Sequence, residues 1–181
     1  MSGTVRALLV SGSTRDESTN TAALVTAAAL APSQVTAVRY TGLAGLPAFN
    51  PDHDGDLLPA AAADLRRQIA AADVVLFCTP EYAGTLPGSF KNLLDWAVGG
   101  GEIYEKPVAW INVAAPGRGA GALATLALVL GYLGTDIVEA ACRDIPVDRS
   151  AVGPGGIITD PRFAEAVGDV WRTLLSRIGP E

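Results

Sequence analysis

Apolar residues follow two alternating patterns along the chain. Short continuous apolar runs, such as residues 74–78, have the length and composition of strands that are buried on both faces. Between these runs lie alanine-rich or amphipathic segments of helical length, such as residues 19–30. We predict strands at 7–10, 34–40, 74–78, 108–113 and 137–143, and helices at 19–30, 60–72, 88–98, 122–133 and 161–178.

Strands that alternate with helices predict an α/β fold with a parallel, doubly wound sheet and helices on both of its faces. The length of 181 residues suits a single domain over 1–181. In such sheets ligands bind beyond the carboxyl ends of the strands, where the strand order reverses. The loops that follow residues 10, 78 and 113 are therefore the segments to search for a site.

Two of the predicted helices differ in their surfaces. The helix at 60–72 has Leu65, Ile69 and alanines on one face, with Arg66 and Arg67 off that face. The helix at 122–133 is apolar on every face, whereas a surface helix carries a polar stripe. One face can cover the sheet, and we expect the other to meet a partner subunit, beside Trp96, in a homodimer or homotetramer. Cover by the C-terminal helix of the same chain is the alternative.

Composition and charge exclude several classes of protein. Hydrophobic residues make up 49% and charged residues 18%, and no apolar run reaches the ~18 residues of a membrane span. The net charge is -6 and the 13 basic residues are scattered, so we expect no nucleic-acid partner and no membrane contact. Cys78 and Cys142 lie far apart in apolar stretches, which is typical of reduced thiols in a cytoplasmic protein.

The irregular stretch 42–59 contains the acidic run 52–56. That run imitates a calcium loop, but its glycine stands fourth instead of sixth, and Ala63 occupies the twelfth position, where a glutamate is required. We therefore expect no metal. His53, the only histidine, has no Gly-x-Ser-x-Gly nucleophile to serve, so we expect a solvated loop residue.

The first loop of interest, residues 12–20, joins a strand to a helix. Its hydroxyls (Ser13, Thr14, Ser18) and the free N–H groups of the helix start face one small volume, which suits an anion. Arg15 can bind a phosphate with two hydrogen bonds, and Asn20 can cap the helix or donate to the same oxygens. An ordinary capped turn without a ligand is the alternative.

The second loop, residues 79–88, leaves the buried third strand with two prolines and two glycines. Rigid turns expose backbone donors and acceptors, which can read the edge of a planar heterocycle while Tyr82 stacks on it or covers it. A proline-rich connection to a helix is the alternative.

At these two loops the chain resembles the NADPH-dependent FMN reductases, a flavodoxin-like family that includes quinone, chromate and azo reductases. Gly-Ser-x-Arg-x-x-Ser-x-Asn occurs here as residues 12–20, and Pro-Glu-Tyr-Asn-x-Ser-x-Pro-Gly-x-Leu-Lys-Asn-x-x-Asp-Trp as residues 80–96, with Ala83, Thr85 and Phe90 replacing asparagine, serine and leucine. The third loop, 114–121, lacks the family's Gly-Gly-x-Arg ending and has Leu123 near the expected arginine.

The resemblance implies a three-layer sandwich with a five-stranded parallel sheet in the order 2-1-3-4-5. It also implies that the protein binds FMN, that NADPH reduces the FMN, and that the reduced FMN then reduces a quinone, azo, metal-oxyanion or flavin acceptor. No side chain is then needed as a catalytic group. The phosphate would be held by Ser13, Arg15, Ser18 and Asn20, and the ring bordered by Pro80, Glu81, Tyr82, Ala83 and Gly84; Thr19, Thr21, Thr79, Ala115, Pro116 and Gly117 complete the expected cofactor site.

A second hypothesis is a flavin or nucleotide binder without turnover, which would act as an electron carrier or a sensor. Residues 117–122 match Gly-x-Gly-x-x-Ala, and Glu139 stands 22 residues beyond Gly117 as a ribose acceptor. A dinucleotide fingerprint normally follows the first strand, whereas this one follows the fourth. Arg15 and the modest net charge favour the enzyme.

Overall fold

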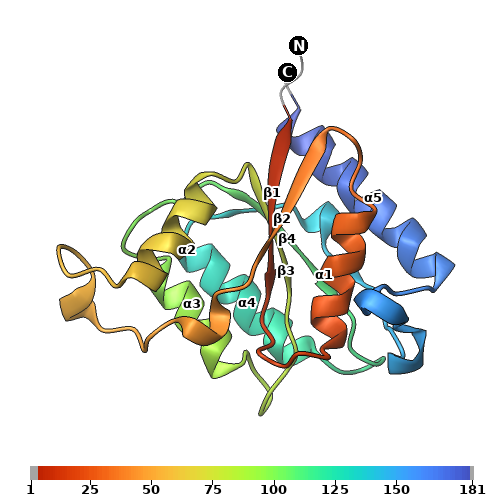
Figure 1. The fold of residues 1–181 in the computed structure, drawn as a ribbon, viewed down its shortest axis with the longest axis horizontal. Helices are drawn as coiled ribbons and strands as arrows, with labels where there is room; N and C mark the ends of the chain where they lie inside the picture. The colour runs from red at the N-terminus through yellow and green to blue at the C-terminus, as the bar shows by residue number, and fades with distance from the viewer. Residues whose placement is uncertain (1–3, 180–181) are drawn as a thin grey trace.

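The computed structural model describes residues 4–179, and helices cover a parallel sheet on both sides (Figure 1). The sheet order is β2-β1-β3-β4-β5 with every pairing parallel, which confirms the predicted order. The strands are β1 (Val5–Ser11), β2 (Val35–Tyr40), β3 (Val74–Cys78), β4 (Pro107–Asn112), β5 (Asp136–Ile137) and β6 (Arg143–Asp144); the helices are α1 (Thr19–Ala29), α2 (Ala60–Ala70), α3 (Gly88–Trp96), α4 (Ala120–Tyr132) and α5 (Pro161–Ile178).

The two faces of the sheet carry separate cores because side chains alternate along each strand. In β3, Val75 and Phe77 pack with α2, α3 and α4, whereas Leu76 and Cys78 pack with α1 and α5. In Figure 1 the sheet is seen nearly edge-on, with α2, α3 and α4 on its left and α1 and α5 on its right. Burial on both faces explains why this strand is a continuous apolar run.

The fifth predicted strand is wrong in its extent. Residues 137–143 do not form one strand: β5 and β6 have two residues each, both pair with β4, and a 3-10 turn (Glu139–Ala141) separates them. Alanines are weak strand formers, and the turn places Ala141 in the core beneath α5. Packing against α5 therefore interrupts the strand.

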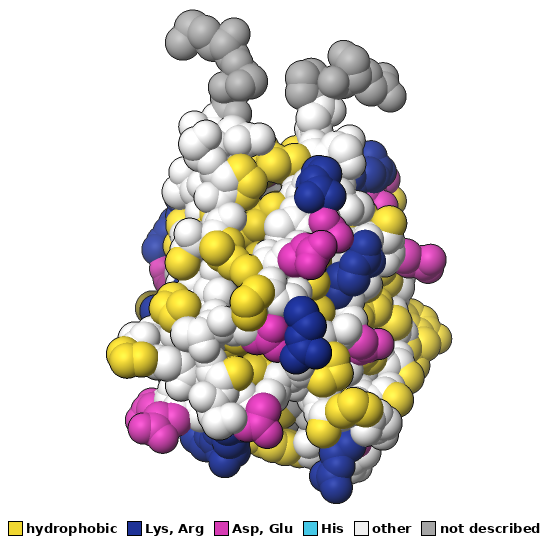
Figure 2. All heavy atoms as spheres, turned by 90° about the vertical axis from the view of Figure 1, so that its right-hand side faces the viewer, with side chains coloured by type: hydrophobic (Ala, Val, Ile, Leu, Met, Phe, Trp, Pro, Cys, Tyr) yellow, Lys and Arg dark blue, Asp and Glu magenta, His cyan; other side chains and the backbone are white. Residues whose placement is uncertain are grey.

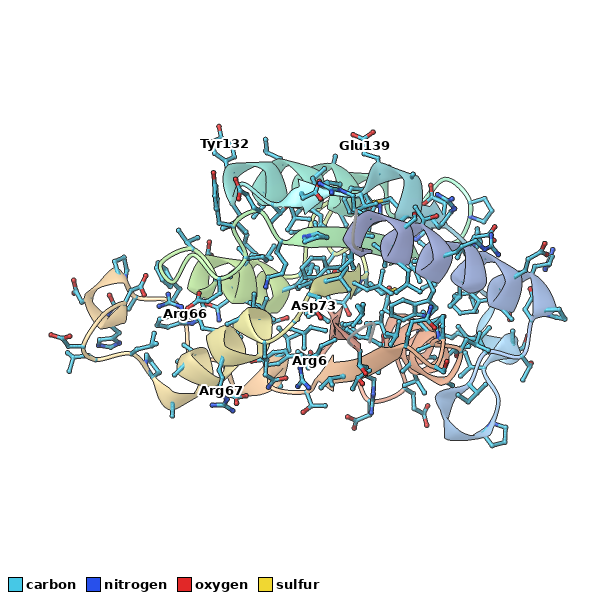
Figure 3. The ribbon with its side chains drawn as sticks, turned by 90° about the horizontal axis from the view of Figure 1, so that it is seen from above. Arg6, Arg66, Arg67, Asp73, Tyr132 and Glu139 are labelled. Carbon is cyan, nitrogen blue, oxygen red and sulfur yellow. The ribbon has the colours of Figure 1, made fainter. Side chains whose placement is uncertain are left out.

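Arg66 is the second correction, because it lies inside the protein although it was expected off the buried face of α2. Its Nε donates to the Trp96 carbonyl at 2.8 Å and its Nη2 to the Asp54 carboxylate at 2.6 Å. Figure 3 shows Arg66 on the side of α2 that faces α3, with Arg67 on the outer side. Asp54, from the acidic run 52–56, therefore anchors that loop, and His53 is exposed as expected.

The side chains of α3 hold the same loop further along. Asn92 accepts from the Phe49 N–H at 2.7 Å and donates to the Pro47 carbonyl at 2.9 Å, and the Trp96 indole donates to that carbonyl at 2.8 Å. This part of the second motif therefore holds the loop that follows β2. Because Trp96 is fully buried, the expectation that a partner subunit lies beside it is wrong.

Helix α4 packs one face on the sheet through Ala122, Leu126 and Leu130. On the opposite face Leu128 is 61% exposed and Tyr132 is 87% exposed. The C-terminal helix does not cover this face, because α5 packs in the core on the other side of the sheet. Across residues 4–179, no helix has both the length and the hydropathy to cross a membrane.

Candidate functional site

The loops after β1 and β3 come together at the carboxyl end of the sheet, at the bottom of Figure 1. The Gly12 N–H donates to the Cys78 carbonyl at 2.8 Å, which extends the pairing of β1 with β3 into these loops. A Cβ on Gly12 would lie 2.2 Å from the Thr79 hydroxyl oxygen, so only glycine allows this approach. The structure therefore brings the first loop (residues 12–20) and the second loop (residues 79–88) into contact.

Hydroxyl groups of the first loop and its flanking residues form hydrogen bonds that fix the loop's conformation. Ser11, at the end of β1, shares a hydrogen bond of 2.9 Å with Thr21 and accepts from the Ser13 N–H at 3.3 Å. Ser13 in turn accepts from the Arg15 N–H at 3.2 Å. Ser11 was not among the site residues expected from the sequence. Thr21, which was expected to contact the cofactor, is engaged with Ser11.

Ser18 is the N-cap residue of α1, but its side chain makes no capping hydrogen bond. The first backbone bond of the helix runs from the Ala22 N–H to the Ser18 carbonyl, and the N–H groups of Thr19, Asn20 and Thr21 have no partner in the described part of the chain. A capped turn would use these groups. Free N–H groups at a helix start instead favour the binding of an anion.

Arg15 lies at the surface of this loop. Its Nη2 donates to the Glu17 carbonyl at 2.6 Å, which keeps the side chain beside the helix start, and it forms no ion pair with a carboxylate of residues 4–179. The remaining guanidinium N–H groups are available to a phosphate.

Asn20 and Cys78 connect α1 to β3. The Cys78 thiol donates to the Asn20 side-chain oxygen at 3.4 Å, and burial raises the pKa of that thiol well above its usual range. The thiol therefore stays protonated and is a weak nucleophile. Asn20 keeps its amide N–H₂ for a ligand, because its oxygen is already engaged.

The second loop contains a tight hairpin. Tyr82 and Thr85 exchange backbone hydrogen bonds of 3.0 and 3.1 Å around Ala83 and Gly84, whose φ angles are +50° and +77°. Positive φ at both central residues defines a type I′ turn, which favours asparagine followed by glycine. The departure from the family motif at Ala83 therefore affects the backbone as well as the side-chain amide. Tyr82 is half-exposed and available to a ring.

Glu81 joins the second loop to the third. Its carboxylate accepts from the N–H groups of Gly121 and Ala122, at 2.8 and 3.2 Å, and so caps α4. A Cβ on Gly121 would lie 2.1 Å from the Gly84 carbonyl oxygen, so a glycine is required at this contact. The side chain of Glu81 thus serves the loop framework, and the hydrogen bond between Thr85 and Thr125 reinforces it.

The third loop turns sharply at Pro116 and Gly117. The Arg118 N–H donates to the Ala115 carbonyl at 2.9 Å, and Gly117 has a φ of +80°, as in a type II turn. Buried Asn112 holds the loop, since its side chain accepts from the Ala114 N–H at 3.1 Å and donates to Asp144 at 2.7 Å. Asn112 is a positioning residue that the sequence analysis missed, although a polar residue ending an apolar strand is a usable signal.

The model of the family described as NADPH-dependent FMN reductase matches residues 5–142, about three quarters of the chain. The chain belongs to this family. The match includes the first two loops and the turn at 115–118, and it ends before β6 and α5.

Individual proteins agree with this assignment. The chain is 40% identical over 97 residues to an NAD(P)H-dependent FMN reductase of Pseudomonas aeruginosa, covering 54% of this chain and 52% of that protein. It is 42% identical over 89 residues to a 2-hydroxy-1,4-benzoquinone reductase of a Burkholderia species, covering 49% and 48%. The chain thus spans about half the length of these curated relatives.

Among solved structures, a flavoenzyme NAD(P)H:(acceptor) oxidoreductase of Paracoccus denitrificans superimposes with a TM-score of 0.76 at 28% identity, covering 94% of this chain and 95% of that one. The flavodoxin-like fold is therefore confirmed. The residues of the site also fit FMN. The free N–H groups at the start of α1 and Arg15 suit its phosphate, and the second loop, joined to the third through Glu81, begins beside the first at the same end of the sheet.

Proposed function

We propose that this protein is an FMN-dependent oxidoreductase that takes a hydride from NADPH and reduces a quinone. Azo compounds, metal oxyanions and free flavin are further acceptors of the same open site. The bound FMN supplies the hydride-accepting and electron-donating chemistry. The observation that carries the proposal is the start of α1, where an N-cap serine leaves three backbone N–H groups free beside Arg15.

The residues of this chain bind and orient in this proposal. The first loop fixes the phosphate by the helix N–H groups, the hydroxyls of Ser13 and Ser18, and the Asn20 amide. The hairpin at residues 82–85 and the turn at 115–118 present backbone groups to the ring edge, and Glu81 sets their relative position through α4. Neither His53, which is exposed in the loop after β2, nor Cys78, whose thiol is buried, is suited to act as a general acid or nucleophile there.

The alternative of a dinucleotide held by residues 117–122 receives no support from the geometry. The N–H groups of Gly121 and Ala122, which a pyrophosphate would need, already donate to Glu81. Glu139, the expected ribose acceptor, points away from the body of the protein in Figure 3. The motif at 117–122 is therefore a loop–helix junction capped from within the chain.

A screen of the purified protein tests the function. Acid-released cofactor is identified by chromatography, and turnover with NADPH is measured against quinones, azo dyes, chromate and free flavin. The proposal expects FMN and the fastest turnover with a quinone. Release of FAD, or no turnover with any acceptor, would contradict it. A carrier without turnover would release FMN but consume no NADPH.

We infer that the subunits associate through the outer face of α4, as a homodimer or homotetramer. Leu128 and Tyr132 stand exposed there, and Figure 3 shows Tyr132 directed away from the protein. An apolar surface of this kind favours contact with a second copy. Light scattering of the wild type and of Leu128→Glu tests this, since the variant should have a smaller mass than the wild type, that of a monomer if the wild type is a dimer. A monomeric wild type would rule the interface out.

We also infer a cytoplasmic location, which the free thiols of Cys78 and Cys142 support, and no nucleic-acid partner. The net charge of -6 supports the second inference, as does Figure 2, in which Lys and Arg side chains on the α1–α5 side are interleaved with acidic ones. Fractionation of cells that produce the tagged protein, and retention on a heparin column, test the two inferences.

A further inference from the structure

A cavity of about 910 Å³ lies beside the first loop, between the start of α1, the end of β2 and the segment 149–156. This volume is in the range of ligand pockets. Ser18, Thr19 and Thr21 of the expected phosphate site line one part of it, whereas residues of the second and third loops do not. The cavity therefore adjoins the phosphate end of the FMN site and is not the space for the ring. Its wall at 149–156 also lies beyond residues 5–142, which the family model matches.

Three arginines from three different elements line this cavity: Arg15, Arg39 and Arg149. All three are exposed, and the ion pairs found within residues 4–179 involve other basic residues. Asp16 and Glu17 line the cavity as well, so three guanidinium groups against two carboxylates leave an excess of one positive charge, which in an acidic chain favours an anion. The planar guanidinium matches a phosphate with paired hydrogen bonds.

The remaining walls suit the other parts of a nucleotide. Asp16 and Glu17 line the cavity and can accept hydrogen bonds from ribose hydroxyls or a base amino group. Val25 and Val152 supply apolar surface for a flat base. Gly155, in the same wall, has a φ of +70° and open space where a Cβ would stand, which allows a ligand to approach the backbone.

We propose that this cavity holds the adenosine end of NADPH, with Arg39 and Arg149 binding its 2′-phosphate. This proposal rests on the proposed function, because it identifies where the reductant docks. Arg15 lies between the two sites, since it lines the cavity and also flanks the start of α1. A dinucleotide anchored here lies beside the phosphate end of the FMN site and can extend along it toward the ring. The 2′-phosphate distinguishes NADPH from NADH, so the two arginines become the specificity-determining residues.

Calorimetric binding to the FMN-loaded protein tests the site without turnover. The probe is adenosine 2′,5′-bisphosphate, with adenosine 5′-monophosphate as the comparison. We expect the bisphosphate to bind more tightly than the monophosphate, and Arg39→Gln or Arg149→Gln to weaken its binding by about 10- to 150-fold, the loss of a charged hydrogen bond. Arg172→Gln is the control, because Arg172 is exposed on α5 and pairs with Asp169. Equal binding of both probes, or wild-type binding by both variants, would overturn the proposal.

Kinetics add a second readout. Each variant should raise the KM for NADPH by a similar factor while its KM for NADH stays within about twofold of the wild type, because NADH lacks the phosphate. The FMN Kd of both variants should match that of Arg172→Gln; a weaker FMN Kd would assign the cavity to the flavin and overturn the proposal. If neither nucleotide is consumed, the proposed function fails, whereas calorimetry still decides whether the cavity binds the bisphosphate.

Discussion

The backbone conformation of Ala83 in the hairpin turn predicts how much substitutions there change the free energy of unfolding. Ala83 has a φ of +50°, and a left-handed conformation costs an L-residue with a Cβ about 1–2 kcal/mol. Asparagine tolerates this region better, so Ala83→Asn should raise the free energy of unfolding by about 0.5–1 kcal/mol. For a chain of this size that corresponds to a melting temperature about 1–4 °C higher. Ala83→Gly should also raise the free energy of unfolding, by up to about 1 kcal/mol, because the strain it relieves exceeds the cost of the greater entropy of the unfolded chain.

Urea unfolding of the FMN-free protein is the assay, since bound FMN would add its own stabilisation. Ala83→Val should lose about 1 kcal/mol or more, because a β-branched residue at positive φ is strained further. Ala48→Asn, in the exposed loop after β2 and without a positive φ, is the control and should stay within about 0.5 kcal/mol of the wild type. If Ala83→Asn gains no stability while Ala83→Val loses none, the turn does not have the left-handed backbone described.

Three further predictions concern single side chains. Arg15→Ala should weaken FMN binding by about 10- to 150-fold in a fluorescence-quenching titration without changing the melting temperature of the FMN-free protein, and unchanged affinity would favour the capped-turn interpretation. Glu81→Ala should uncap α4 and cost about 0.5–2 kcal/mol, with faster amide exchange in its first turn, whereas Glu81→Gln should lose less; identical exchange in both variants would contradict this. Burial, and to a lesser extent the charge of Asp64, raises the pKa of Tyr40 to about 12, above its value of about 10 in the unfolded chain. The free energy of unfolding should therefore decrease as the pH rises from 10 to 12, and it should decrease less in Tyr40→Phe.

The arrangement of the sheet was predictable because each element has a local signal. The run 74–78 is apolar without interruption because it is buried on both faces, and α1 ends close to Pro32, where the helix cannot continue. The fifth strand was not predictable at this level, because packing of Ala141 beneath α5 decides where it breaks. That contact joins segments far apart in the sequence.

In the site, too, the features with a local sequence signal were predictable and those set by long-range contacts were not. The two motifs located the loops, and the turn chemistry of Pro116 and Gly117 is visible in the sequence. The hydrogen-bond partners of Glu81 and Arg66 could not be predicted from the sequence. Glu81 caps a helix 40 residues away and Arg66 is buried in an amphipathic helix, but in the sequence both look like surface charges. Long-range polar contacts of this kind leave no periodic pattern.

Anaerobic addition of NADPH to the FMN-loaded protein tests the central claim most directly. If the protein transfers hydride from NADPH to bound FMN, one equivalent of NADPH removes the yellow flavin absorbance, and a quinone added without oxygen restores it. If the absorbance persists with NADPH in excess, the protein binds flavin without acting as a reductase.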